Sequence, residues 1–256
     1  MSLSKTKIKY VQSLKQKKFR DEYNVFIAEG DKIISDLLPM MKCELLIASK
    51  DYTDFIKDKE YQIDEIIEVS RDDLERVSFQ KTPQHSLGIF YKPQYTLNQS
   101  ELSNQLVLAL DGIQDPGNMG TIIRLADWYG IENIVCSEDT VDVYNPKVVQ
   151  ATMGALARIK VHYVELGNWL ELQKEIPIYG AFLDGQNIYK TGISETGIIV
   201  MGNEGNGIRP MVEKHVTDKI YIPNYPEGRA TSESLNVGVA TAIICNEFRR
   251  QFMLKQ

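Results

Sequence analysis

Short apolar runs, separated by polar and amphipathic segments, mark the first third of the chain. A run of four to six apolar residues bounded by polar ones has the length of a β-strand, and the amphipathic stretch at 31–38 has helical periodicity. The pattern predicts a small α/β unit with strands at residues 25–28, 44–48, 66–69 and 87–90. A polar stretch with a proline and no periodicity follows, so we expect domains at 1–91 and 105–256 joined by a linker at 92–104.

The second part of the chain alternates between buried-type strands and helices. Residues 106–110 are continuously apolar, which is typical of a strand covered on both faces. Further strands are expected at 134–136, 178–182, 198–201 and 220–222, and helices at 121–129, 145–157 and 234–248. Asn145 and Pro146 have the residue types of an N-cap and a first helical position, and Gly130 ends the helix before it. Such alternation predicts an α/β fold with a parallel sheet, whose ligands bind at the loops after the strands.

Composition narrows the class of protein. A hydrophobic fraction of 43% and an aromatic fraction of 9% exclude a disordered chain. No apolar stretch approaches the roughly 18 residues of a membrane span, and no signal segment follows the N-terminus, so we expect a cytoplasmic protein. The three cysteines and three histidines are widely scattered, which predicts no disulfide framework, no metal site and no local signature of a catalytic triad. The cysteines are interpreted as reduced and buried: Cys43, Cys136 and Cys245.

Basic residues are concentrated at the N-terminus although the net charge is −6. The first 20 residues contain no acidic residue. A solvated helix would explain this charge run, and so would a surface that contacts RNA phosphates. The candidate RNA-binding residues are Lys5, Lys7, Lys9, Lys15, Lys17, Lys18 and Arg20.

Three loops at expected strand ends have unusual sequences. The first spans 111–120 and leads into a helix that carries Arg124, the second spans 201–207, and the third runs from 222 to 236. Glycines after a strand let backbone groups approach a ligand closely. The second loop has the spacing GxxGxG without a Walker lysine, so it does not match a dinucleotide or P-loop site. Taken singly, each loop is also explained as an ordinary turn or helix cap.

Taken together and in order, the three loops resemble the motifs of the SpoU family of RNA ribose methyltransferases, in the SPOUT class. The matching residues are Asp115-Pro116-x-Asn118-x-Gly120 with Arg124, Gly202-Asn203-Glu204-Gly205-x-Gly207, and Ile222-Pro223 followed by Ser234-Leu235-Asn236-Val237. The stretches at 145–149 and 153–156 are similar to the intervening segment of the family, and Phe26-Ile27-Ala28-Glu29-Gly30 resembles part of its ribosomal-protein-like substrate-binding domain. Residues 224–233 form a longer link than the family commonly has.

The resemblance implies a C-terminal domain with a deep trefoil knot, S-adenosylmethionine as cofactor, RNA as substrate and a homodimer formed through this domain. It implies that the cofactor is held by Met201, Gly202, Asn203, Gly205, Gly207, Ile222 and Leu235, with main-chain groups of the glycines and of Ile222 prominent. The residues that it implies at the reaction site are Arg124, Asn118, Ser234, Asn236 and Glu204.

Roles for these residues follow from the chemistry of methyl transfer to a ribose 2′-hydroxyl. A guanidinium keeps its proton throughout the accessible pH range, so we expect Arg124 to bind the neighbouring phosphate and stabilise charge on O2′ and not to act as a base. Asn118 and Ser234 would orient the ribose, Asn236 would brace the loop, and Glu204 would anchor backbone or cofactor groups.

Three alternatives stay open from the sequence. Ribosomal RNA is favoured over transfer RNA as the substrate, because the N-terminal region resembles a ribosomal-protein-like module. A catalytically silent RNA-binding protein with the same fold is a second reading, although the candidate catalytic residues are all present. A dehydrogenase with an aberrant glycine loop is a third.

Overall fold

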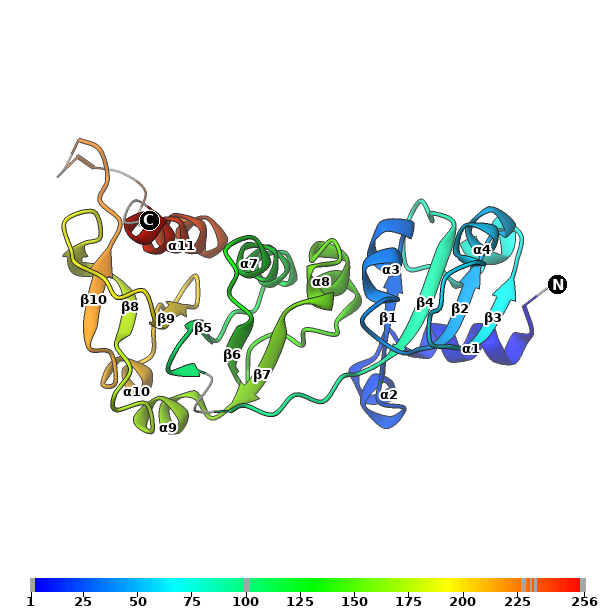
Figure 1. The fold of residues 1–256 in the computed structure, drawn as a ribbon, viewed down its shortest axis with the longest axis horizontal. Coiled ribbons are helices and arrows are strands. Elements are labelled where there is room, and N and C mark those ends of the chain that lie inside the picture. Colours follow the sequence, from blue (N-terminus) through cyan, green and yellow to red (C-terminus); the bar gives the residue numbers. More distant parts are fainter. Residues whose placement is uncertain (1–2, 99–101, 227–228, 231, 233, 254–256) are drawn as a thin grey trace. The chain divides into compact units, whose positions relative to one another are not determined.

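The structure is a computed structural model that describes residues 3–98, 102–226, 229–230, 232 and 234–253. It divides into two compact units, the first comprising Met1–Gln94 with Asp142–Arg158 and the second Tyr95–Val141 with Ile159–Gln256. Residues 99–101 of the expected linker and residues 227, 228, 231 and 233 of the long loop lie outside the described residues. Each unit has its own sheet, and each is considered separately (Figure 1).

The first unit is an α/β fold with a four-stranded mixed sheet in the order β1-β4-β2-β3. Strand β4 runs antiparallel to both β1 and β2, whereas β2 and β3 are parallel. The four strands predicted for this region are confirmed, with ends that shift by up to three residues. The elements are α1 (Lys5–Ser13), α2 (Lys17–Glu22), β1 (Val25–Glu29), α3 (Asp31–Leu37), β2 (Cys43–Ala48), α4 (Lys50–Ile56), β3 (Ile63–Glu68), α5 (Arg71–Val77), β4 (Ser86–Tyr91), α8 (Pro146–Ala151) and the 3₁₀ turn η1 (Ala155–Ala157).

Serine caps set the starts of three helices in this unit. The hydroxyls of Ser4, Ser49 and Ser70 each accept a hydrogen bond from the backbone N–H three residues on. This bond satisfies one of the amide groups that has no partner inside the helix. The helices α1, α4 and α5 therefore begin where the sequence offers a serine.

The two faces of the first sheet are buried by different helices. Val25 and Ile27 of β1 belong to a core cluster that also contains residues of α1 and α5. Because side chains alternate along a strand, Phe26 points to the opposite face, where its ring lies 5.0 Å from that of Tyr144. The segment Asp142–Arg158 thus packs as part of this unit. Its helix α8 has the expected cap, because Asn145 Oδ1 accepts from Lys147 N at 3.0 Å.

The second unit contains a six-stranded sheet in the order β10-β8-β9-β5-β6-β7, with every neighbouring pair parallel. The predicted parallel α/β architecture is confirmed. In Figure 1, α7 and α11 lie side by side on one side of this sheet and α9 and α10 on the other. The elements are β5 (Leu106–Asp111), α7 (Pro116–Trp128), β6 (Asn133–Ser137), β7 (Lys160–Val164), α9 (Leu166–Glu171), β8 (Ile178–Asn187), β9 (Gly197–Gly202), α10 (Pro210–Glu213), β10 (Asp218–Tyr221) and α11 (Val237–Met253).

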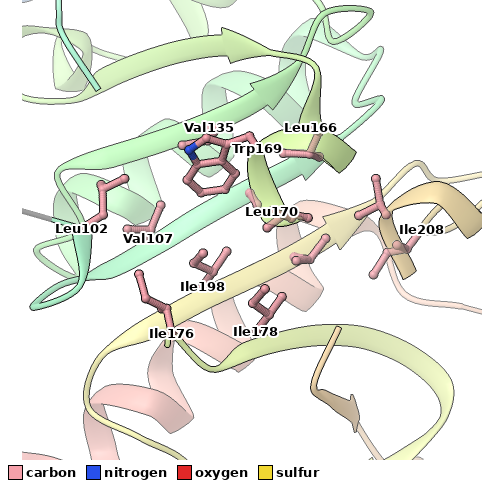
Figure 2. Close-up of a cluster of buried hydrophobic side chains, with 13 residues drawn as sticks. Leu102, Val107, Val135, Leu166, Trp169, Leu170, Ile176, Ile178, Ile198 and Ile208 are labelled. Atoms are coloured by element: carbon pink, nitrogen blue, oxygen red, sulfur yellow. The ribbon is translucent and has the colours of Figure 1, made fainter. Parts of the chain in front are cut away.

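A dense apolar cluster fixes the α9 side of this sheet (Figure 2). Trp169 and Leu170 of α9 pack there on Val107 of β5 and on Ile198 of β9, all at most 7% exposed. The alternate residues of β5, such as Leu108, are also fully buried and face the other layer. Burial on both faces explains why residues 106–110 are continuously apolar. The cluster holds the strand ends, and so the loops that follow them, in a fixed arrangement.

Several element boundaries differ from the sequence predictions. Helix α7 begins at Pro116, five residues earlier than expected, and α11 begins at Val237 instead of residue 234. The helix expected at 145–157 stops at Ala151 and a 3₁₀ turn follows. Strand β7 and helix α9 were not predicted. Leu235 is exposed and precedes α11, whereas Phe248 of α11 is buried.

The cysteine prediction is confirmed. Cys43, Cys136 and Cys245 are free and buried. Burial raises the pKa of Cys43 and of Cys245 to about 12, so both are neutral thiols at physiological pH. Among the helices in the described part of the chain, none is long and apolar enough to cross a membrane.

Candidate functional site

A cavity of about 780 Å³ lies in the second unit, where the loops after β9 and β10 meet the middle of β8 and the start of α11. All seven residues expected to hold the cofactor line it, together with Glu204 and Ser234. The second and third loops of the sequence analysis therefore converge on one site. The lining residues that carry the argument below are Met201, Gly202, Asn203, Glu204, Gly207, Ile222, Ser234 and Leu235.

The lining is apolar with a few polar groups and no positive charge. Met201, Ile222 and Ile244 supply apolar surface, and the only carboxylates in the described lining are Asp184 and Glu204. Of the described residues that line the cavity, none is lysine, arginine or histidine. Small-molecule sites are typically concave and apolar with a few placed polar groups.

The glycines of the second loop let the loop fold back on itself. A Cβ on Gly202 would lie 2.3 Å from the carbonyl carbon of Gly207, so only glycine fits there. Gly207 has φ +66°, in the left-handed region that glycine adopts without strain. The backbones of Asn203 and Gly207 exchange two hydrogen bonds, of 3.0 and 2.9 Å. These glycines were expected to admit a close ligand, but at Gly202 the close neighbour is the loop's own backbone.

Asn203 holds the second loop in shape and joins it to the first. Its Oδ1 accepts from Gly205 N at 2.9 Å and from Asn206 N at 3.1 Å, while its Nδ2 donates to Gly112 O at 2.7 Å. Both ends of its side-chain amide are thus used within the protein. Asn203 lines the cavity as expected, but its side chain serves the loop.

Asn118 connects the first loop with the second and the third. Its Nδ2 donates to Glu204 Oε1, and its Oδ1 accepts from Asn236 Nδ2 at 2.9 Å. Asn236 also caps α11, because its Oδ1 accepts from Gly238 N at 3.0 Å and from Val239 N at 3.2 Å. The cap of α7 is Asp115, whose Oδ1 accepts from Asn118 N at 2.8 Å, so the side chain of Asn118 is free for this network.

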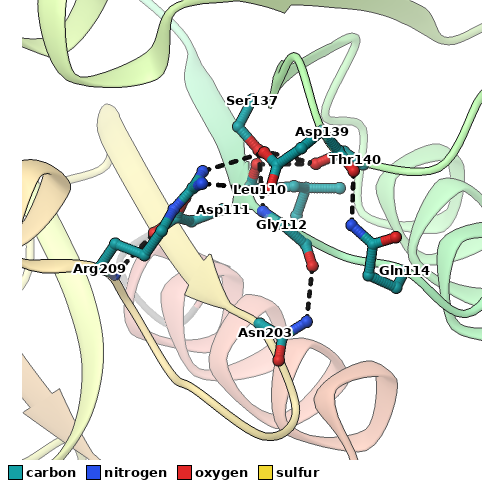
Figure 3. Close-up of polar contacts among 9 residues, drawn as sticks. All are labelled: Leu110, Asp111, Gly112, Gln114, Ser137, Asp139, Thr140, Asn203 and Arg209. Carbon is teal, nitrogen blue, oxygen red and sulfur yellow. Dashed lines mark hydrogen bonds and ion pairs between the residues drawn. The ribbon is translucent and has the colours of Figure 1, made fainter.

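A second network lies behind the loops and was missed by the sequence analysis (Figure 3). The side chain of Asp111, fully buried at the end of β5, accepts hydrogen bonds from the backbone N–H and the guanidinium of Arg209. Arg209 also pairs with Asp139, at 3.1 Å. The only sequence signal was the position of Asp111, a charged residue that directly follows an apolar run. Arg209 fixes the end of the glycine loop to the strand beside it.

The charges in this network perturb one another. A hydrogen bond from Ser137 and the nearby Arg209 guanidinium hold the pKa of Asp139 below its ordinary value. The hydrogen bond with Asp111 raises the pKa of Arg209, which therefore stays charged. The network thus keeps one cation and two carboxylates in place at the base of the three loops.

Arg124 lies on the exposed side of α7, beyond the residues that line the cavity. It makes no hydrogen bond or ion pair with any residue in the described ranges, and it follows Thr121, which lies against Gly238 of α11, by one turn. An exposed arginine with no acidic partner is available to bind a phosphate. Of the five candidate catalytic residues, Asn118, Glu204 and Asn236 form the network described above, and Ser234 lines the cavity. Arg124 belongs neither to this network nor to the described cavity lining.

The N-terminal basic residues differ in their exposure and in their partners. Lys5, Lys9, Lys15, Lys17 and Lys18 are exposed on α1, α2 and the turn between them, and Lys7 is half-buried and pairs with Glu65. Arg20 is the exception. It is only 2% exposed, and its guanidinium donates to the carbonyls of Leu14 and Lys15 and pairs with Asp142 at 2.6 Å. Its buried position is a correction to the expected phosphate contact, because the side chain is enclosed and both terminal guanidinium nitrogens already have partners inside the first unit.

Two family models match the chain. Residues 105–246 match the SpoU rRNA Methylase family, and residues 5–88 match the MRM3-like substrate binding domain. The first match contains all three loops and the cavity that the second and third loops line. The second lies within the first unit.

Three individual proteins are similar over almost the whole chain. The 23S rRNA (guanosine(2553)-2′-O)-methyltransferase RlmP of Bacillus subtilis is 32% identical over 97% of this chain and 98% of its own. The structure of a TrmH-family protein from Porphyromonas gingivalis is 39% identical, with a TM-score of 0.88 over 98% of this chain and 100% of that one. The AdoMet-bound structure of an rRNA methyltransferase from Sinorhizobium meliloti is 27% identical, with a TM-score of 0.84 over 98% of this chain and 97% of that one.

Proposed function

The chain belongs to the SpoU rRNA methylase family, and from that premise we propose that it transfers a methyl group from S-adenosylmethionine to a ribose 2′-hydroxyl of ribosomal RNA. The family makes it an RNA methyltransferase. The choice of a ribose oxygen in rRNA is supported by the B. subtilis relative, whose name gives that specificity. The observation that carries the proposal is the convergence of the second and third loops on one cavity, to which Asn118 ties the first loop.

The cavity suits S-adenosylmethionine in its charge and its surface. The cofactor carries a sulfonium cation, and the described lining offers two carboxylates and no competing positive charge. Apolar side chains of Met201, Ile222 and Leu235 can cover the adenine, while backbone groups of the glycine loop bind its edges. The cofactor of the S. meliloti structure supports this assignment. When bound, S-adenosylmethionine supplies the electrophilic methyl group.

Arg124 is proposed to act on the RNA. A 2′-hydroxyl is a weak nucleophile that gains negative charge as it loses its proton. The exposed guanidinium of Arg124 can bind the adjacent phosphate and stabilise that charge, since it has no acidic partner in the described part of the chain. Holding the hydroxyl in place lowers the entropic part of the barrier.

The remaining site residues are proposed to position the reacting groups. The network of Asn118, Glu204 and Asn236 fixes the first loop against the cavity. Ser234 lines the cavity and is proposed to orient the ribose. Asn236, as the cap of α11, ties the third loop to this geometry. The family's deep trefoil knot is proposed for residues 105–256 of this chain, with the second and third loops forming the cofactor pocket.

The first unit is proposed to bind RNA, with residues 1–91 as its substrate-binding domain. Its match to a substrate binding domain supports this role. The exposed lysines at positions 5, 9, 15, 17 and 18, on α1, α2 and the turn between them, can supply positive charge to a phosphate backbone. An rRNA substrate also supports a cytoplasmic location.

A homodimer through the second unit is proposed from exposed apolar side chains on two adjacent helices. Trp128 at the end of α7 is 83% exposed and Val239 on α11 is 50% exposed, with Leu235 just before α11. Large apolar side chains exposed on neighbouring elements are a feature of protein interfaces. A two-fold axis through these helices would let Arg124 of one subunit serve the site of the other.

Mapping of 2′-O-methylation in cellular RNA tests the proposed reaction. We expect one ribosomal nucleotide to lose its 2′-O-methyl group in cells that lack this protein and to regain it when the gene is restored. A lost methyl group in tRNA would move the substrate from rRNA to tRNA. An unchanged map in both RNA classes would contradict the proposal and favour a catalytically silent RNA-binding protein.

A further inference from the structure

A second cavity, of about 410 Å³, lies in the first unit and has no part in the proposed methyl transfer. Two stretches that were noted in the sequence as similar to the family, but were given no role in the reaction, meet there. Ile27 and Glu29 of β1 form one wall, and α8 with its start at Pro146 forms another. The loop before β4 contributes the rest. The cleft is lined by Ile27, Glu29, Phe79, Gln80, Lys81, Pro146, Lys147, Gln150 and Ala151.

The uncharged residues of the cleft lining have the chemistry that recognises a nucleobase. Phe79 offers an aromatic ring on which a base can stack, and Ile27 adds apolar surface. Gln80 and Gln150 each carry a carbonyl oxygen and an amide NH₂, which can pair with the donors and acceptors of a base edge. Single-stranded RNA is recognised mainly through such stacking and edge contacts.

The charges around the cleft favour a phosphate backbone. Lys81 and Lys147 are exposed, and neither pairs with an acidic side chain in the ranges that the structure describes. Glu29, the one carboxylate among the described residues of the lining, is 8% exposed. It is occupied within the protein, since it accepts from the hydroxyl of Ser78 and, at 2.8 Å, from Phe79 N. Glu29 therefore fixes the loop that carries Phe79, and the two lysines are left for an anion.

We propose that this cleft binds a single unpaired nucleotide of the RNA substrate. Its base stacks on Phe79 with its edge on Gln80 and Gln150, and its flanking phosphates contact Lys81 and Lys147. Lys15 of the N-terminal basic segment also borders the cleft, because its Nζ lies over the Phe79 ring, 4.7 Å from the ring centre, and the base stacks on the part of the ring that lines the cleft. This inference rests on the proposed function only in taking RNA as the ligand. It assigns base recognition to the first unit.

Salt-dependent RNA binding distinguishes the phosphate contacts from the base contacts. The probe is ribosomal RNA from cells that lack the protein, bound to the full chain at several salt concentrations. Lys81→Ala/Lys147→Ala should weaken binding and lower the slope of log Kd against log salt by about 1.4, since each phosphate contact to a single strand contributes about 0.7. The matched control is Lys32→Ala/Lys50→Ala, which removes two exposed lysines outside the cleft and should leave the slope near that of the unmodified chain.

The base contacts are tested by Phe79→Leu, which keeps an apolar side chain and removes the stacking surface. We expect roughly tenfold weaker RNA binding with an unchanged salt slope, because stacking contributes independently of charge. Gln150→Ala should act in the same direction. If thermal unfolding shows that Phe79→Leu perturbs folding, Gln150→Ala tests the base contacts instead, because Gln150 lies on a different element.

Ultraviolet cross-linking of the same complex locates the nucleotide. The inference expects cross-linked peptides that contain Phe79 or residues 146–151. It is overturned if cross-links form only at α1 and α2, or if the cleft pair and the control pair behave alike. These measurements do not depend on catalysis, so a chain that transfers no methyl group but cross-links through the cleft would contradict the proposed reaction and leave the nucleotide site standing.

Discussion

Asn236 Nδ2 donates a hydrogen bond of 2.9 Å to Asn118 Oδ1, although the two residues lie 118 positions apart in the chain. The same Asn118 side chain donates to Glu204. One amide group thus joins the start of α7, the glycine loop and the start of α11. The three loops are held together by a side chain that uses both its donor and its acceptor.

Replacement of Asn118 by aspartate should disrupt the hydrogen bonding between the loops, because it removes the donor to Glu204 and places two carboxylates side by side. We expect Asn118→Asp to lower methyl transfer roughly 10- to 100-fold, the cost of a lost hydrogen bond to a charged group. Adding Glu204→Gln to the same chain supplies an amide donor to the introduced carboxylate and should restore part of the rate. Steady-state methyl transfer by the two single variants and the double variant measures this, and strictly additive losses would refute the link.

Arg124 should be needed for the reaction and not for the cofactor. Arg124→Ala removes the proposed phosphate contact and the charge near O2′, so methyl transfer should fall at least about 100-fold. Binding of S-adenosylhomocysteine, measured by calorimetry, should change by no more than a few fold. Arg71→Ala, at an arginine whose side chain is 75% exposed on α5, is the matched control. A substantially active Arg124→Ala enzyme would remove Arg124 from the mechanism.

Arg209 should contribute to stability through Asp111. Arg209→Ala leaves a buried carboxylate without its cation, which costs roughly 3 kcal/mol in the free energy of unfolding. Asp139→Asn removes the more exposed partner, whose side chain is 53% exposed, and should cost less than about 1 kcal/mol. Urea unfolding of the two variants compares these values. Equal losses would show that Asp111 does not depend on the guanidinium.

Glu29 gives stability a pH dependence of opposite sign to that of most carboxylates. Burial raises the pKa of Glu29 above its ordinary 4.5, against the hydrogen bonds from Ser78 and Phe79 and the charge of Lys15. Its contribution to stability is therefore fully present below pH 4.5 and is lost as the pH rises through the folded-state pKa. The Tm of Glu29→Gln relative to the unmodified chain should rise between about pH 4 and about pH 7. Glu75→Gln, at an exposed position, is the control, and a pH-independent difference for Glu29→Gln would contradict the account.

A charge on the exposed face of α11 should dissociate the proposed dimer. Val239→Glu places a carboxylate on the helix proposed to form the interface, and burial of an unpaired charge opposes association. We expect the unmodified chain to sediment as a dimer at micromolar concentration and Val239→Glu as a monomer. Leu172→Glu, at a residue 68% exposed after α9, should not change the mass. A monomeric unmodified chain would contradict the interface.

Local patterns in the sequence were sufficient to predict the main elements of the fold. The uninterrupted apolar run at 106–110 predicts a strand buried on both faces, and β5 is such a strand. Asn145 and Pro146 predict the start of α8, because a cap depends on neighbouring residues only. Residues of the second and third loops were also expected at one site, and they line one cavity.

Contacts between distant residues could not be predicted in this way. The pairing of Arg209 with Asp111 depends on the register of two strands, which a single sequence does not reveal. The burial of Arg20 depends on Asp142, 122 positions away, so a basic run on a helix looked uniformly solvated. Likewise, the asparagines of the loops had the residue type of a cap or turn, and only the fold shows that Asn118 joins the loops while Asn236 caps α11.

The position of the transferred methyl group is the most direct test of the central claim. Purified protein is incubated with methyl-labelled S-adenosylmethionine and ribosomal RNA from cells that lack the protein, and the RNA is then digested to nucleosides. The account predicts that the label is recovered in a single 2′-O-methylated nucleoside. Label in a base-methylated nucleoside, or no incorporation by a folded protein that binds the cofactor, would contradict it.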